Sequence, residues 1–346
     1  MHSQWKQIII IMNQKYFIGI DISKEKIDVA IVLGDFSILA ERVVKNEPSK
    51  IESFLKAFCR KYKSDHSDLL VCCENTGIYN RPLEKICDRL GIALWVEHAV
   101  KIKRASIDMR GKTDRKDALR IAEYSVRYQD RKVLYKEPSG RIAAIKANQK
   151  VRETIITNRV AIENQMREAK SHDPELHKQL TKAYSPIIKA LNKQLHRCKK
   201  EIESLIEEEP QLKKNVQLMK TIPGIGMQNA TQMVIETDNF NRFQSAKHLA
   251  CYAGVVPFAN ESGTMVRRQK ISKMANQKMK SNLHLGAMAA VRADPELKEY
   301  FKRKVEEGKN KMSVINAVRR KLVDRIWAVI QRQTPYELET KTILSK

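Results

Sequence analysis

The sequence lacks the features that identify several common classes of protein. Its six cysteines are dispersed, and no two of them have the C-x-x-C spacing typical of a zinc ribbon. That pattern excludes such a domain and favours free thiols in a reducing cytoplasm. No apolar run approaches the roughly 18 residues that span a bilayer. The run at 8–12 is far shorter, and no cleavage site with small residues follows it.

Acidic residues are scarce relative to basic ones. The 346 residues contain 65 lysines and arginines against 40 aspartates and glutamates, a net charge of +25. This excess indicates a polyanionic partner, for which nucleic acid is the first candidate and a membrane surface the second. Hydrophobic residues make up 42%, too many for an intrinsically disordered chain, and the length predicts two to three domains.

The patterns divide the chain into five parts. Residues 1–15 are expected to be an extension, because the first clear strand begins soon after Met12, and translation could start at Met1 or at Met12. Three structured parts and a tail follow, at 16–135, 136–215, 216–333 and 334–346.

The part from 16 to 135 has the composition of an α/β domain. Its first strands are joined by connections too short for a parallel crossover, which favours an antiparallel meander. Helices and buried strands then alternate, which is the element order of a ribonuclease-H-like fold. The predicted strands are 17–22, 27–32, 37–44, 69–73 and 92–96, and the predicted helices are 49–62, 82–90 and one with Asp114 close to its start.

Four carboxylates lie where such a fold would need them. Asp21 is on the first strand and Glu74 ends the fourth. Asp114 and Asp117 are three residues apart, which places them on one helix face. Converging carboxylates repel one another unless cations neutralise them, and two divalent ions would also clamp the oxygens of a phosphodiester. Each residue alone could be a cap or a surface group, but the ordered set favours a metal site.

Residues from about 140 to 220 have helical periodicity. Their clearest apolar row steps by three and four residues, as in a coiled coil, and consists of Ile188, Leu191, Leu195, Cys198, Ile202 and Leu205. Breaks at 171–174 and 207–210 delimit two long helices. These helices either form a hairpin within the chain or pair with another subunit as a dimerisation arm. His172 and His196 are expected to be solvated rather than metal ligands.

The last third combines a glycine turn with a basic run. Ile222-Pro223-Gly224-Ile225-Gly226 resembles a helix-hairpin-helix turn, whose backbone N–H groups at Gly224 and Gly226 could hold a phosphate, although a plain tight turn fits equally well. Residues 241–333 contain 20 basic and 7 acidic residues. Ser262 lies beside Gly263 on a predicted loop, where it could attack a phosphate whose charge nearby arginines stabilise. The basic candidates for nucleic-acid binding are Arg267, Arg268, Lys270, Lys273, Lys278 and Lys280.

Two separated blocks of motifs resemble one family. The first comprises Gly19-Ile20-Asp21-Ile22-Ser23-Lys24, Glu74 before Thr76-Gly77, and Lys112-Thr113-Asp114-Arg115-Lys116-Asp117-Ala118. The second comprises the glycine turn, Ala253-Gly254-Val255-Val256-Pro257, Ser262-Gly263, and Ile271-Ser272-Lys273 with Asn276. Together they are similar to the DEDD-type insertion-sequence transposases of family one-ten, the bridge-RNA-guided serine recombinases.

The resemblance implies a fold, a chemistry and partners. It implies a RuvC-like N-terminal domain that binds Mg²⁺ through Asp21, Glu74, Asp114 and Asp117, and a mostly helical C-terminal transposase domain with Ser262 as nucleophile, on either side of the coiled-coil middle that the heptad spacing predicts. It also implies a phosphoserine intermediate, element and target DNA as substrates, a structured guide RNA, a homo-oligomer (dimer or tetramer) and a bacterial cytoplasmic, nucleoid-associated location.

Three other functions remain alternatives to this interpretation. A RuvC-like nuclease or junction resolvase would use the carboxylates without serine chemistry. A sugar kinase of the actin-like fold also begins with an apolar Gly-Ile-Asp strand, but the glycine-rich phosphate turn that it needs after the aspartate is missing here. A non-catalytic nucleic-acid scaffold would explain the charge and leave the ordered carboxylates unexplained.

Overall fold

The structure is a computed structural model that describes residues 14–105, 113–262, 265–271 and 275–338, with the backbone alone at 258–262 and 265–271. The chain forms two compact units, Met1–Glu137 and Pro138–Lys346. The two possible start codons, Gly263, Lys273 and most of the predicted tail lie outside the described residues.

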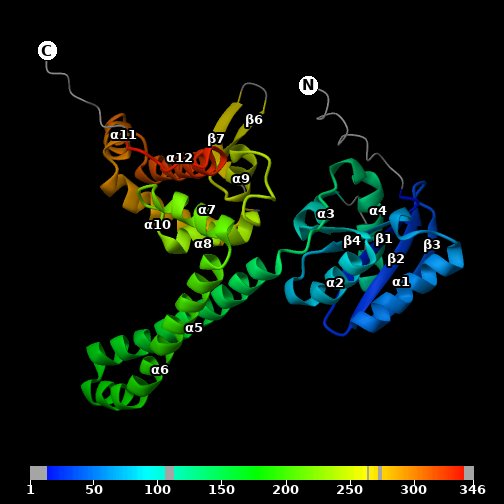
Figure 1. Ribbon diagram of the computed structural model, residues 1–346, viewed down its shortest axis with the longest axis horizontal. Coiled ribbons are helices and arrows are strands. Elements are labelled where there is room, and N and C mark those ends of the chain that lie inside the picture. The colour runs from blue at the N-terminus through cyan, green and yellow to red at the C-terminus, as the bar shows by residue number, and fades with distance from the viewer. Residues whose placement is uncertain (1–13, 106–112, 263–264, 272–274, 339–346) are drawn as a thin grey trace. The chain divides into compact units, whose positions relative to one another are not determined.

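The first unit is built on a five-stranded mixed sheet (Figure 1). Strands β1, β2 and β3 are antiparallel, and β4 and β5 run parallel to β1, in the order β3-β2-β1-β4-β5. The predicted meander is therefore confirmed, because its two short connections allow only antiparallel pairing. The strands are β1 (Tyr16–Ile22), β2 (Lys26–Leu33), β3 (Ile38–Lys45), β4 (Leu69–Glu74) and β5 (Ala93–Glu97).

Helices cover both faces of this sheet. Helices α1 (Pro48–Tyr62) and α2 (Arg81–Leu90) pack their apolar sides on one face, where Leu55 and Ile86 join the core around Ile18. Helices α3 (Ala99–Ala105) and α4 (Asp114–Arg127) cover the other face, where Ile121 packs near Trp95. Burial on both faces explains why β4 is apolar along almost its whole length.

Glycine at position 19 lets α4 approach β1 closely. A Cβ atom at Gly19 would lie 2.2 Å from the Ala118 carbonyl oxygen and 2.2 Å from the Ala122 backbone nitrogen. Any side chain there would push the helix away from the strand. This contact brings the first turn of α4, which carries Asp114 and Asp117, toward the strand that carries Asp21.

The second unit begins with a long helical hairpin (Figure 1). Helices α5 (Gly140–His172) and α6 (Pro174–Glu207) pack along each other, and Asp173 between them caps α6 by accepting from the Leu176 N–H at 3.0 Å. Of the predicted apolar row, Cys198 and Ile202 are buried, whereas the other four residues are half-buried. The two helices therefore pair within one chain, and a dimerisation arm stays a prediction.

The rest of the second unit is mostly helical, around one apolar core. Its helices are α7 (Pro210–Lys220), α8 (Met227–Thr237), α9 (Ala246–Tyr252), α10 (Gln277–Ala293), α11 (Pro295–Glu306) and α12 (Lys311–Arg332). One difference from the prediction is the segment around Ser262, which was expected to be a loop. It forms the antiparallel hairpin β6 (Pro257–Ser262) and β7 (Met265–Ile271).

Candidate active site

Asp21 lies in a concentration of negative charge. It is half-buried near the end of β1, directly opposite Asp28 on β2. Burial raises the pKa of Asp21 to about 6, helped by the negative charges of Asp117, Asp114, Glu74 and Asp28. All four carboxylates predicted from the sequence therefore contribute to one electrostatic field.

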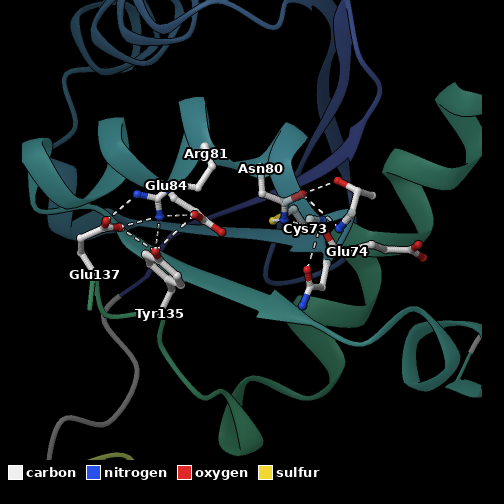
Figure 2. Close-up of polar contacts among 10 residues, drawn as sticks. Cys73, Glu74, Asn80, Arg81, Glu84, Tyr135 and Glu137 are labelled. Carbon is white, nitrogen blue, oxygen red and sulfur yellow. Dashed lines mark hydrogen bonds and ion pairs between the residues drawn. The ribbon is translucent and has the colours of Figure 1, made fainter. Parts of the chain in front are cut away.

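Glu74 is held by the turn that follows β4. The buried side chain of Asn80 donates from Nδ2 to the Glu74 carbonyl oxygen at 2.8 Å (Figure 2). Asn80 Oδ1 accepts from the backbone N–H of Thr76 at 3.1 Å and from the Thr76 hydroxyl. Gly77 takes a left-handed conformation with φ +80° and completes the turn. A single amide thus fixes the backbone on both sides of the point where β4 ends.

A second asparagine links this turn to the end of β1. Asn46, which follows β3, donates from Nδ2 to the carbonyl oxygens of Ser23 at 2.9 Å and Tyr79 at 3.0 Å. Ser23 is two residues beyond Asp21, and Tyr79 is five beyond Glu74. Asn46 and Asn80 were not predicted from the sequence, in which the Asn-Thr-Gly turn at 75–77 was the only signal near them.

Basic side chains neutralise the two carboxylates at the start of α4. Thr113 caps this helix by accepting from the Lys116 N–H. Lys26 Nζ lies 2.9 Å from both Asp28 Oδ2 and Asp114 Oδ2. Arg120 Nη1 lies 2.8 Å from Asp117 Oδ1. Positive charge is therefore already drawn into this cluster by the protein's own residues.

The donor set suits a hard divalent cation. In the described part of the chain, no three acidic, histidine or cysteine side chains lie close enough to enclose one metal ion. Asp114 and Asp117 are instead ion-paired with Lys26 and Arg120. Carboxylate oxygens are the ligands that Mg²⁺ prefers, so the donor type suits the predicted ion, and its binding here stays a prediction.

A network of ion pairs lies next to the Glu74 turn (Figure 2). Arg81 bonds to Glu84 at 2.9 Å and to Glu137 at 2.6 Å. The Tyr135 hydroxyl donates to Glu137 at 2.6 Å. Partial burial raises the pKa of Glu137, but the hydrogen bonds from Arg81 and Tyr135 outweigh it and keep that pKa below its usual value. The network attaches the end of the first unit to α2, beside Asn80.

Ser262 and most of the predicted basic residues belong to the second unit. Ser262 is the last residue of β6, and its backbone pairs with Met265. On β7, Arg267 pairs with Asn260 and Lys270 with Phe258, and Arg268 lies on the same strand. On α10, Lys278 is ion-paired with Glu153 of α5, so its charge is already partly neutralised.

The glycine turn between α7 and α8 has a packing role at one of its two glycines. Gly224 has φ +88°, and a Cβ atom there would lie 2.2 Å from the Gly286 carbonyl oxygen on α10. Gly226 precedes α8 and has no atom within 4 Å of where a Cβ would lie. Close packing therefore explains Gly224, while the role of Gly226 as a phosphate contact stays a prediction.

None of the helices in the described ranges is long and apolar enough to cross a membrane. The strand order of the first unit and the helices on both faces of its sheet are those of a ribonuclease-H-like domain. Two family models match the chain. One, for DEDD transposases of IS110 elements and described as "Transposase", covers residues 18–169. The other, described as "Transposase IS116/IS110/IS902 family", covers residues 216–302.

Similar proteins agree with these matches. "Pilin gene-inverting protein" of Moraxella lacunata is 27% identical over 337 residues, which span 93% of this chain and 98% of the relative. Its namesake in Moraxella bovis has the same identity and coverage. "Insertion element IS110 uncharacterized 43.6 kDa protein" of Streptomyces coelicolor is 26% identical over 148 residues, 43% of this chain and 36% of the relative. The chain belongs to the IS110 family of transposases, enzymes that recombine DNA.

Proposed function

We propose that the chain cuts and rejoins the DNA of an insertion sequence through a covalent bond to Ser262. The observation that carries this proposal is the field around Asp21, because all four expected carboxylates contribute to it from three separate elements. The two family models support it as well, since they match in order the unit with the carboxylates and the region with the serine.

Asp21, Glu74, Asp114 and Asp117 are the proposed ligands of Mg²⁺. When bound, the ion would supply positive charge that lowers the pKa of an attacking oxygen and stabilises charge on a phosphate. The chain's own residues position this cluster: Asn80 and Asn46 fix the ends of β4 and β1. Lys26 and Arg120 hold the two α4 carboxylates in place by ion pairs.

The proposed covalent step conserves the bonds of the DNA backbone. The Ser262 Oγ forms a bond to phosphorus, one phosphorus–oxygen bond of the DNA breaks, and the leaving oxygen ends as a hydroxyl after it takes a proton. A DNA hydroxyl then attacks the phosphoserine, and the serine hydroxyl forms again. The Moraxella relatives are named for the inversion of a gene. Inverting a gene requires DNA strands that are cut and then rejoined.

The proposal includes partners for this chemistry. Element ends and target DNA are the substrates, and a structured RNA from the element guides their pairing. The net charge of +25 supports polyanionic partners. Arg267, Arg268, Lys270, Lys273, Lys278 and Lys280, with the turn at Gly224 and Gly226, are the proposed contacts. The active assembly is a homo-oligomer, with the helical hairpin as its dimerisation arm.

A covalent adduct distinguishes this function from that of a plain metal nuclease. We expect wild-type protein, labelled element-end DNA and Mg²⁺ to give a protein–DNA adduct on a denaturing gel. Ser262→Ala should bind the DNA with nearly unchanged affinity and form no adduct. Asp21→Ala should also lose the adduct, and mixing the two variants should recover part of it if one chain's carboxylates serve another chain's serine.

The matched control is Ser281→Ala, an exposed serine on α10 whose hydroxyl bonds only to the Gln277 carbonyl. It should form the adduct at the wild-type rate. Strand cleavage at the wild-type rate by Ser262→Ala, with cleavage lost in Asp21→Ala, would instead assign the chain to the nucleases without serine chemistry.

A further inference from the structure

Among the residues that the structure describes, the buried charged side chains are paired, with one exception. Asp28, Glu84 and Glu97 each form an ion pair with a basic residue, and so does Asp294. Arg319 on α12 is 6% exposed, and within the described residues it has no acidic partner. An isolated buried charge costs several kcal/mol in order-of-magnitude terms, so burial normally requires a counter-ion. Arg319 therefore has no counter-ion among the residues that the structure describes.

The contacts of Arg319 are neutral. Its Nη2 lies 2.6 Å from Nδ1 of His284 on α10, and its Nη1 lies 3.5 Å from Oδ1 of Asn316. Its Nε is buried and has no hydrogen-bond partner. Because a guanidinium only donates, Nδ1 of His284 must accept, and the imidazole proton is then on Nε2. Burial and the adjacent guanidinium lower the pKa of His284, which keeps the ring neutral.

The position of this pair suggests the class of ligand. Lys280 lies one turn before His284 on α10, and its Cδ is 3.7 Å from where a Cβ of Gly254 would be. Asn316 donates to the Val255 carbonyl oxygen at 2.9 Å. Gly254 and Val255 lead directly into β6, the strand that ends at Ser262. The unpaired charge is therefore close to the base of the hairpin that carries the proposed nucleophile.

We propose that Arg319 and His284 form a binding site for a backbone phosphodiester of nucleic acid. The phosphate oxygens accept from His284 Nε2–H and from the Nη N–H groups of Arg319 that His284 and Asn316 leave unused, and Lys280 adds a second positive charge. A guanidinium fork matches phosphate geometry and loses less solvation than an ammonium on burial. This inference rests on the proposed function only in requiring that the chain binds nucleic acid.

Arg319→Met tests the site, because methionine keeps the apolar bulk and removes the charge. Without nucleic acid, the variant should unfold at the wild-type temperature or higher, since an unpaired buried charge is lost. Its affinity for a mixed-sequence DNA duplex should fall several-fold at moderate salt. The slope of log K against log salt should become shallower by about one, the effect of one lost phosphate contact.

Arg325→Met is the matched control on the same helix. Arg325 is paired with Asp294 and with Glu296 at 2.6 Å. This variant should unfold at a lower temperature, because Asp294 would stay buried and unpaired, and its salt slope should equal that of wild type. His284→Gln, which keeps a donor but shortens its reach, should reduce affinity without lowering the unfolding temperature.

The same titration with single-stranded RNA identifies the source of the phosphate. If Arg319→Met changes the salt slope with only one polymer, that polymer occupies the site. If it changes the slope with both DNA and RNA, both polymers occupy the site. An Arg319→Met protein that unfolds earlier and keeps the wild-type slope with both polymers would make Arg319 a packing residue and overturn the inference. Salt-independent binding, or no binding, by the wild-type protein would refute the proposed nucleic-acid function itself.

Discussion

At the scale of single residues, the side-chain amides of Asn80 and Asn46 stabilise the backbone around the candidate site. Asn80 satisfies three groups around the end of β4, and Asn46 bridges two turns. Neither residue contributes to the charge cluster, yet both fix the strand ends from which Asp21 and Glu74 project. Neither side chain titrates, so charge patterns in the sequence do not reveal these two asparagines.

Asn80→Ala tests this positioning. The variant removes the hydrogen bonds that join the buried Asn80 amide to the Glu74 carbonyl and the Thr76 N–H, each with a net contribution of about 0.5–1.5 kcal/mol. We expect the free energy of unfolding to fall by about 1–3 kcal/mol in urea titration. The Mg²⁺ concentration needed for half-maximal adduct formation should rise. Asn75→Ala, at an exposed position in the same turn, is the control and should change both quantities little; equal effects of the two variants would contradict the positioning role.

At the scale of elements, structure set by neighbouring residues was easier to predict than structure set by pairing between segments. Helices α1, α2, α6 and α7 have proline in their first turns, and Ser139 caps the start of α5, so local residues mark where these helices begin. The hairpin of β6 and β7 was missed, because its ladder joins residues of a segment that reads as a Gly/Pro-rich loop.

The helical hairpin gives a prediction at this scale. Leu191 and Leu195 are half-buried near the middle of α6. If the apolar residues of this row pack only within the chain, replacing both leucines by Asp should lower the temperature at which the helical signal in circular dichroism is lost. It should instead dissociate protomers in light scattering if the row also joins subunits. Replacing exposed Lys189 and Lys193 by Ala is the control. Unchanged stability and unchanged mass in the Asp variant would exclude both roles.

At the scale of the whole molecule, the excess of positive charge dominates. A net charge of +25 far exceeds what ion pairs within the chain can use. Phosphate contacts release counterions, so affinity for nucleic acid falls steeply as salt rises.

We therefore expect the purified protein to carry nucleic acid until it is washed at high salt. The affinity for duplex DNA should fall by orders of magnitude between about 50 mM and 200 mM salt, as expected for six or more phosphate contacts. Fluorescence anisotropy with labelled duplex measures this, and a charge-matched polyglutamate competitor controls for simple attraction between opposite charges. A binding constant that stays flat over this range would remove the reason to expect a nucleic-acid partner.

The sequence by itself determined the strands of the sheet, the first two helices and the family, because these depend on local periodicity and motifs, whereas the role of the four carboxylates stays a prediction. Tertiary structure alone decided the pairing of Asp28 and Asp114 through Lys26, the amides that fix the turns, and the burial of Arg319 against His284. Each of these contacts joins elements that are distant in the chain or depends on which side chains are buried. Local sequence carries little information on either, since non-local packing sets both.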